Sequence, residues 1–499
     1  MIIGVDVGGT NTDVAIIDED RNLMTYKYPN EYGITNILKE IDRNIDIKSA
    51  RLVISTSLPL NIIASRFNEI KTCSLVIPGP GLNYSDYGII LKGAVNHRGD
   101  IVENIDKEEV EKVLSENKAQ TLAISAKFSI RNPQIEYDVL KISLKYFDRK
   151  DIALSNYVGF LNFPLRINTT IVNAKIMREV WELTDAIRKF TENFFYYKGD
   201  GGIIPWQVAL RNPSELYNSS PAAVAYGAYY LTKEENALVI DIGGTTTDFI
   251  LIRDGAPEIE ERVKIHGKRT HIRCVKSFSI PYGGDSLFDG ELKPYRIDKP
   301  IAFGGKHITL TDLLNGVGEE VGNFRESRRA VKGIDCERYV DYYIDMIAKK
   351  AKEFDADKII GTGYLARYLI PEIAKRCGKK FIVPKHSESA NAVGVAVSRI
   401  SLTLYARFDT ERSIAVYNGE VNKETFEKVS GHPDDEEIIN SAINKAKELA
   451  ANFGANEEDL DDVDILYFSS FPIVRGGIMR GKIADVIVQI KPGLSSNVL

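Results

Sequence analysis

The stretch that decides the fold runs from Ala237 to Ile252 and reads ALVIDIGGTTTDFILI. Apolar residues fill both ends, and between them lies a Gly-Gly turn rich in hydroxyl groups, with Asp241 before it and Asp248 after it. Apolar, β-branched runs on either side of a glycine turn predict a buried β-hairpin. Glycines in such a turn let the backbone approach a phosphate and point its N–H groups at the phosphate oxygens.

The chain opens with a near copy of this hairpin. Residues 2–17 read IIGVDVGGTNTDVAII, with Asp6 and Asp13 in the places of the two aspartates. Both copies follow the pattern Asp-x-Gly-Gly-Thr-x-Thr-Asp, and 235 positions separate Asp6 from Asp241. A single copy is also typical of an ordinary hairpin turn, but a matched pair argues against coincidence. We therefore expect two similar lobes that face one ligand.

The residues of the two turns are the candidates for holding phosphate. They are Gly8, Gly9, Thr10, Asn11, Thr12, Gly243, Gly244, Thr245 and Thr246. Asp6 and Asp241 end their strands, where a carboxylate can hold Mg²⁺ or its waters against a phosphate. Asp13 and Asp248 are candidates for a general base or a second metal contact. These four aspartates are the predicted catalytic residues.

The position of the glycines excludes two common nucleotide sites. A dinucleotide fingerprint or a P-loop needs a helix after its glycines. Here β-branched strand residues follow both turns, and no Gly-Lys-Ser/Thr occurs. Phosphate loops inside hairpins are typical of sugar kinases, actin and the seventy-kilodalton chaperones, which hold ATP between two closing lobes. The predicted fold is accordingly an α/β, two-lobed actin-like ATPase core.

Composition limits the other classes of function. The chain has 499 residues, 44% of them apolar and 27% charged, as in a globular protein. Acidic residues outnumber basic ones by only 70 to 64, without a Lys/Arg-dense run, so nucleic acid is not an expected partner. We find no signal peptide and no apolar run of the roughly 18 residues that a membrane span needs. The four cysteines lie far apart, which favours a reducing compartment, and we expect a cytoplasmic protein.

Alternating strand and helix patterns divide the chain into three expected domains. Residues 1–168 form an α/β lobe with the first hairpin, and residues 169–400 form a second lobe with the second hairpin. A long helix is predicted from Thr169 to Phe195. Residues 401–499 read as a small appended α+β domain, with strands near 464–468 and 484–490 after a charged helix.

The order of several further motifs resembles the hydantoinase/5-oxoprolinase family, in particular its A-type, ATP-using subunit. The resemblance covers roughly residues 1–400. Beyond the hairpins, its anchors are 128–133 (FSIRNP), 200–202 (DGG), 220–223 (SPAA), 282–286 (YGGDS), 303–305 (FGG) and 361–363 (GTG). Asp285 stands where the family pattern has a glycine.

The resemblance implies ATP-dependent opening of a cyclic amide such as a lactam, 5-oxoproline or a hydantoin. It implies that the two turns hold phosphate, that Gly283 and Gly284 also bind the nucleotide, that adenosine lies at Gly361 and Gly363, and that Asp6 and Asp241 hold Mg²⁺. It also implies a separate B-type subunit as a partner. A homo-oligomer is compatible with the sequence.

Other interpretations stay open at this point. The same core would suit a small-molecule kinase, an ATP-dependent ligase or a nucleotide-gated regulatory ATPase. His266, His271 and Cys274 have a spacing that metal ligands can show, although alternation along a strand favours ordinary structural roles. His307, beside Gly304-Gly305, suits a cleft and a surface loop equally well.

Overall fold

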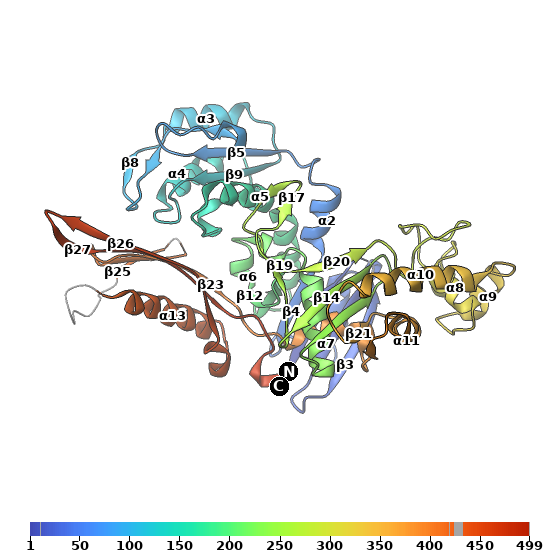
Figure 1. Cartoon of the computed structure of the whole chain (residues 1–499). Helices are drawn as coiled ribbons and strands as arrows, with labels where there is room; N and C mark the ends of the chain where they lie inside the picture. The colour runs from blue at the N-terminus through green and yellow to red at the C-terminus, as the bar shows by residue number, and fades with distance from the viewer. Residues whose placement is uncertain (10, 419, 424–432, 499) are drawn as a thin grey trace. The chain divides into compact units, whose positions relative to one another are not determined.

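The computed structural model describes residues 1–9, 11–418, 420–423 and 433–498 (Figure 1). The chain divides into two compact units, and each draws on separate parts of the sequence. The first unit comprises Met1–Ser55, Ser219–Glu260 and Val275–Val397. The second comprises Thr56–Asn218, Glu261–Cys274 and Ser398–Leu499. The three consecutive domains expected from the sequence stay a prediction.

The first sheet of the first unit is built on the N-terminal hairpin. Its strand order is β4-β1-β2-β3, and β1, β2 and β3 form an antiparallel meander. The strands are β1 (Ile2–Val7), β2 (Asn11–Ile17), β3 (Leu23–Pro29) and β4 (Arg51–Thr56). Ile3, Val5 and Val14 are fully buried, as their β-branched side chains favour in a packed sheet.

The second sheet of this unit is built on the second hairpin. Its order is β15-β14-β13-β21-β22, with β20 pairing along β14. The strands are β13 (Ala237–Ile242), β14 (Thr247–Arg253), β15 (Ala256–Pro257), β20 (Ser277–Ile280), β21 (Lys358–Thr362) and β22 (Lys380–Ile382). Leu238, Ile240 and Phe249 enter a core shared with the helices that follow.

The helices of the first unit are α1 (Ile34–Asp42), α7 (Ser219–Thr232), α8 (Leu310–Gly316), α9 (Phe324–Ala330), α10 (Cys336–Ala351), α11 (Ala366–Cys377) and α12 (Ala390–Val397). Leu313, Ile347 and Leu369 pack against the second sheet from α8, α10 and α11.

Helices α7 and α12 pack closely because both are made of small residues. Helix α12 contacts β1 and β2, whereas α7 contacts β13, β14 and β21. At their contact, a Cβ added to Gly394 would lie 1.8 Å from the carbonyl oxygen of Ala223, and one added to Gly227 would lie 1.8 Å from that of Ala390. Only glycine permits this approach. The two helices therefore join the sheets of the two hairpins within one unit.

A parallel sheet forms the first part of the second unit. Its order is β10-β9-β5-β6, and all three pairings are parallel. The strands are β5 (Thr72–Ile77), β6 (Ile89–Ile90), β9 (Thr121–Ala126) and β10 (Ile152–Leu154), and the helices are α2 (Leu58–Ser65), α3 (Lys107–Glu116), α4 (Gln134–Ser143) and α5 (Phe163–Arg188). Continuous apolar strands covered by α3, α4 and α5 are typical of such sheets.

Helix α5 begins and ends earlier than the predicted range, Thr169 to Phe195. The Asn162 side chain accepts a hydrogen bond from the Leu165 N–H and so caps the helix, and a proline stands in the first turn. Proline fits there because the first N–H groups of a helix have no intrahelical partner. The predicted end is wrong because Phe194 already belongs to strand β11 (Phe194–Tyr197), which pairs with β12 (Ile203–Pro205) before the short helix α6 (Trp206–Ala209).

The C-terminal part of the second unit is an antiparallel sheet of order β25-β24-β23-β27-β26, along which α13 lies (Figure 1). The elements are β23 (Thr403–Asp409), β24 (Ile414–Tyr417), β25 (Glu420–Lys423), α13 (Asp435–Asn452), β26 (Val463–Arg475) and β27 (Ile478–Ile490). The two expected strands are thus halves of a longer hairpin. Gly476 and Gly477 close it with positive φ angles of 59° and 78°, as a type I′ turn requires.

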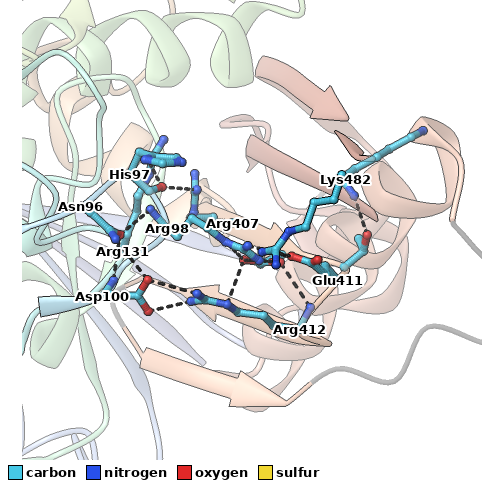
Figure 2. Close-up of polar contacts among 12 residues, drawn as sticks. Asn96, His97, Arg98, Asp100, Arg131, Arg407, Glu411, Arg412 and Lys482 are labelled. Atoms are coloured by element: carbon cyan, nitrogen blue, oxygen red, sulfur yellow. Dashed lines mark hydrogen bonds and ion pairs between the residues drawn. The ribbon is translucent and has the colours of Figure 1, made fainter. Parts of the chain in front are cut away.

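An ion-pair network ties a turn of the parallel-sheet part to this C-terminal sheet (Figure 2). The turn joins β7 (Ala94–Val95) and β8 (Ile101–Glu103). From it, Arg98 donates to Asp409 with an Nε–Oδ2 distance of 2.9 Å. Arg131 and Arg407 both pair with Asp485, at 3.0 and 2.9 Å. The side chains of these arginines and aspartates are largely buried. Because an unpaired charge in such a place costs several kcal/mol of stability (about 3–5), each charge needs a partner.

The small strands β17 (Lys264–Ile265) and β18 (Lys268–Arg269) complete the second unit, while β16 (Ile259–Glu260) and β19 (Cys274–Val275) lie where the chain passes from one unit to the other. None of the helices in the described part of the chain combines the length and apolar character needed to cross a membrane.

Candidate functional site

The two glycine turns have the same backbone geometry. In the first hairpin Asp6 lies opposite Asp13, and in the second Asp241 lies opposite Asp248. Each turn is closed by one hydrogen bond between corresponding residues: Gly8 N–H to Asn11 O at 3.1 Å, and Gly243 N–H to Thr246 O at 3.0 Å. The sequence repeat is therefore a structural repeat, and both hairpins are confirmed. Thr10 lies outside the described residues.

Side chains from three elements hold the carboxylates of the first hairpin. The amide of Asn391, in the first turn of α12, donates to Asp6 at 2.7 Å and to Asp13 at 3.2 Å. Lys27 of β3 pairs with Asp13 at 2.9 Å, and the Ser389 hydroxyl donates to the same carboxylate at 3.3 Å. Both aspartates are buried. The charge of this pair is thus compensated by one cation and by neutral donors.

Threonine hydroxyls hold the carboxylates of the second hairpin. Thr362, at the end of β21, donates to Asp241 at 2.7 Å, and Thr246 donates to Asp248 at 3.0 Å. Neither carboxylate has a cation within ion-pair distance in the described part of the chain. The negative charge of the carboxylates in the second hairpin is therefore less compensated than that in the first hairpin.

The electrostatics of Asp6, Asp241 and Asp248 shows that the two hairpins share one environment. Burial raises the pKa of Asp6, with a further contribution from the charge of Asp13. Burial likewise raises the pKa of Asp248, and it raises that of Asp241 to about 6. The charges of Lys27 and Asp13, on the first sheet, also act on Asp241. Carboxylates with raised pKa values that are gathered from two equivalent loops are typical of a functional site.

The segment 282–286 packs directly on the second turn. Gly284 N–H donates to Gly243 O at 2.9 Å, and Asp285 N–H donates to Gly244 O at 2.7 Å. A Cβ on Gly244 would come within 2.7 Å of the Asp285 carboxylate, and a Cβ on Gly283 would lie 2.6 Å from the Gly243 oxygen. The two glycine segments are therefore in contact, and their role in binding stays a prediction.

Asp285 itself is buried beside the turn. Its carboxylate accepts a hydrogen bond from the Tyr364 hydroxyl at 3.1 Å and lies 3.5 Å from Arg296 Nε. Burial raises the pKa of this carboxyl group. Tyr364 also shares a hydrogen bond with Thr311. Asp285, which stands where the family pattern has a glycine, is therefore part of a hydrogen-bond network with Tyr364 and Thr311.

The segment 361–363, which is predicted to contact adenosine, lies at the end of β21 next to the second hairpin. Gly363 has φ of 87°, and a Cβ there would lie 2.2 Å from Ile242 O. A Cβ at Gly361 would lie 2.5 Å from Ile370. Protein packing alone therefore requires glycine at 361 and 363, so their proposed contact with adenosine needs an independent test.

Gly9 differs from the other glycines of the site. It is exposed at the tip of the first turn, its φ is not positive, and a Cβ built on it would meet nothing within 4 Å. Neither backbone strain nor packing against this chain accounts for a glycine here. A glycine at such a position leaves the backbone N–H groups accessible, as the predicted phosphate contact requires.

Sequence reasoning missed three residues that shape the first half of the site: Lys27, Asn30 and Asn391. The Asn30 amide donates to Gly8 O at 2.6 Å, and its oxygen accepts from the Thr12 hydroxyl at 3.0 Å, so that hydroxyl already has a partner. Lys27 and Asn30 lie in and directly after β3, which was not predicted. The only signal for Asn391 is its place at the start of a small-residue helix.

No group of three or more His, Cys, Asp and Glu side chains is arranged to hold a metal ion within the described residues. His266 stacks on Phe67 at 4.4 Å and bonds the Ile63 carbonyl, while His271 stacks on Phe160 at 4.2 Å. Both histidines therefore have structural contacts of their own within the second unit.

The fold and the paired turns define an α/β protein of the actin-like ATPase class, as the sequence predicted. Two family models match the chain: the hydantoinase/oxoprolinase N-terminal region over residues 2–85, and hydantoinase/oxoprolinase over residues 166–319. The resemblance of the chain to the hydantoinase/oxoprolinase family is thus confirmed.

Two relatives are each 21% identical to the chain. An uncharacterised protein of Methanocaldococcus jannaschii matches over 56% of the chain and 47% of its own length, so the chain spans about half of that relative. Caprolactamase subunit alpha of Pseudomonas jessenii matches over 82% of the chain and 72% of its own length.

Two solved structures share the fold of nearly the whole chain. A nucleotide-free acetone carboxylase has a TM-score of 0.66 at 16% identity and covers 99% of this chain and 88% of its own. The ATP-dependent caprolactamase from Pseudomonas jessenii has a TM-score of 0.64 at 18% identity, with 98% and 87% covered.

Proposed function

We propose that this chain is a Mg·ATP-dependent enzyme subunit that activates the carbonyl oxygen of a cyclic amide by phosphorylation, so that water opens the ring. The observation that carries the proposal is the pair of corresponding glycine turns, each flanked by opposed aspartates, within one compact unit. The family and the name of the caprolactamase relative support the amide as the substrate class.

The turns have the properties of a phosphate site. Backbone N–H groups at Gly9 and at the corresponding Gly244 would donate to phosphate oxygens, and the exposed Thr245 hydroxyl would add a donor. The lack of any packing reason for glycine at Gly9 supports a ligand there. Gly283 and Gly284 would contribute by holding the second turn in place.

Asp6 and Asp241 are the proposed magnesium residues. Mg²⁺ keeps several of its waters and takes one or two carboxylates together with the substrate phosphates, so a cluster of three protein ligands is not needed. A pKa of about 6 leaves Asp241 ionised at neutral pH and available to a cation. Bound Mg·ATP would supply the phosphoryl group and offset its charge.

The carboxylates that oppose this pair, Asp13 and Asp248, are the proposed bases. Asp13 is held by Lys27 at 2.9 Å and by the Asn391 amide at 3.2 Å. Asp248 is bonded only by hydroxyl groups and has a raised pKa. A base with a raised pKa is better matched to neutral pH, and this favours Asp248 for proton transfer.

A second subunit is the proposed partner, supported by the name subunit alpha of the caprolactamase relative. Two other enzyme functions would use the same fold and nucleotide site. A kinase would yield a stable phosphorylated product, and an ATP-dependent carboxylase, to which the fold is also similar, would consume bicarbonate.

The test is phosphate release from Mg·ATP by the purified full chain, with and without 5-oxoproline, hydantoin, 2-pyrrolidinone and caprolactam. Stimulation by one ring compound, with its open-chain acid as product, is the expected result. Asp241→Asn should abolish the stimulated rate, whereas Asp20→Asn, at an exposed position, should leave it unchanged. ATP turnover that no amide alters, even with a candidate partner subunit added, would refute the proposal.

A further inference from the structure

A polar pocket lies within the second unit, away from the hairpins in sequence. Five separate segments line it, and its principal side chains are Phe160, Lys198, Asp200, Glu215, His271 and Tyr405. It includes Asp200 of the Asp-Gly-Gly motif, to which the proposed nucleotide site gives no role. The cavity has a volume of about 30 Å³. One water needs about 10–15 Å³, so the space suits a small head group rather than a whole molecule.

A buried charge cluster forms one side of this pocket. Lys198 Nζ lies 3.1 Å from the Asp200 carboxylate and 3.7 Å from that of Glu215, and its side chain is only 3% exposed. Asp200 also accepts a hydrogen bond from Gln489 at 2.7 Å, and Gln489 in turn accepts one from Arg273 at 2.6 Å. Burial of several charged side chains carries a large desolvation cost, and this favours a functional role for the cluster.

The two carboxylates differ in how fully they are bonded. Asp200 is tied by Lys198, Gln489 and the Gly202 N–H, and its pKa stays low because of the two nearby cations. Glu215 accepts a hydrogen bond from the Asn212 amide on Oε1 at 3.0 Å, its Oε2 lies 3.7 Å from Lys198 Nζ, and burial raises its pKa. Because Oε2 has only this longer contact with Lys198, it is the carboxylate oxygen with capacity for another donor.

Tyr405 supplies an unused donor beside this oxygen. Its hydroxyl makes no hydrogen bond to any of the described residues, although the charge of Glu215 acts on it more than any other charge does. Burial keeps this phenol neutral, so it can donate. Phe160 packs edge-on against Tyr405 at 5.1 Å and stacks on His271, which gives the pocket an apolar wall.

We propose that this pocket binds the amide group of the substrate, with Tyr405 and Lys198 donating to its carbonyl oxygen and Glu215 accepting its N–H. An amide presents one acceptor and one donor side by side, which matches a donor pair next to an open carboxylate oxygen. A carboxylate ligand would instead be repelled by Glu215 and Asp200. This assignment rests on the proposed function, since it names where the amide of that reaction is held.

The test measures binding of 2-pyrrolidinone, caprolactam, 5-oxoproline and acetate to the full chain by ligand-observed NMR and calorimetry, without ATP. Tyr405→Phe removes only the unbonded hydroxyl, and Glu215→Gln keeps the acceptor for Asn212. Lactam binding should weaken about fivefold in Tyr405→Phe and at least about tenfold in Glu215→Gln, because one hydrogen bond is lost in each. The matched control Tyr196→Phe, whose hydroxyl bonds Thr184 elsewhere in the same unit, should bind lactams as the wild type does.

The outcomes of these binding experiments distinguish a failure of the pocket assignment from a failure of the proposed function. Unchanged lactam affinity in both pocket variants, tighter binding of acetate than of lactams, or no lactam binding by the chain would each overturn the pocket assignment. If both variants lose lactam binding while the wild type fails to bind Mg·ATP, the pocket stands and the ATP-dependent function fails. Asp241→Asn should change nucleotide affinity and leave lactam affinity unaltered.

Discussion

Replacing Asp241 with asparagine is expected to stabilise the folded chain while it removes nucleotide turnover. Burial raises the pKa of this carboxyl group from 3.8 to about 6, against the hydrogen bond from Thr362 that lowers it. One pKa unit corresponds to about 1.4 kcal/mol, so the ionised form costs the folded state at most about 3 kcal/mol at neutral pH. Asparagine has no charge to desolvate, and its oxygen can still accept the hydrogen bond from Thr362.

The sign of this effect fixes its pH dependence. A carboxyl group whose pKa is higher in the folded than in the unfolded state favours folding when protonated, and this advantage is lost as the pH rises through about 6. Asp241→Asn should therefore raise the free energy of unfolding by up to about 3 kcal/mol at pH 7.5 and by little at pH 4.

Urea denaturation followed by circular dichroism measures this difference at the two pH values. Tryptophan fluorescence is unsuitable because Trp181 and Trp206 both belong to the second unit, whereas Asp241 belongs to the first. The exposed Asp20→Asn variant is the control and should change neither stability nor turnover. A variant less stable than the wild type at pH 7.5, or a gain that is equal at both pH values, would refute the desolvation argument. Retained Mg²⁺-dependent turnover would refute the metal role.

Four further predictions concern this site and the helices packed beside it. Nucleotide turnover by the wild type should fall about tenfold per pH unit below pH 6, because Asp241 must be ionised, and a pH–rate profile measures this slope. Gly9→Ala should leave the free energy of unfolding within about 0.5 kcal/mol of the wild type but weaken ATP binding at least about tenfold in calorimetry, because its Cβ meets only the ligand. By contrast, Gly394→Ala should cost about 3 kcal/mol in urea denaturation, since its Cβ would overlap a carbonyl oxygen of the facing helix; an unchanged stability would contradict the packing of α7 on α12. Asn391→Leu should lower the free energy of unfolding by about 2–3 kcal/mol, because two buried carboxylates lose their shared donor, and equal stability at pH 7.5 would show that this donor is dispensable.

The sequence by itself determined the hairpins, their equivalence and the fold class. These features are local: β-branched runs and a glycine turn select an extended pair within about 16 residues, without help from distant parts of the chain. The capped helices α3 and α13 follow from equally local signals, namely Asp106 and the Asp434–Glu437 capping box. The sequence-level error in α5 came from a cap and a proline that are also local and were overlooked.

Only the tertiary structure decided which side chains surround those hairpins. Asn391 reaches Asp6 across 385 positions of sequence, and Gln489 reaches Asp200 across 289. No periodicity or propensity records such contacts, because they depend on how sheets and helices stack rather than on neighbouring residues. The same holds for the pocket around Lys198 and for two compact units that each take up separated parts of the chain. The local pattern thus specified the phosphate turns, whereas long-range packing set the charges that tune them.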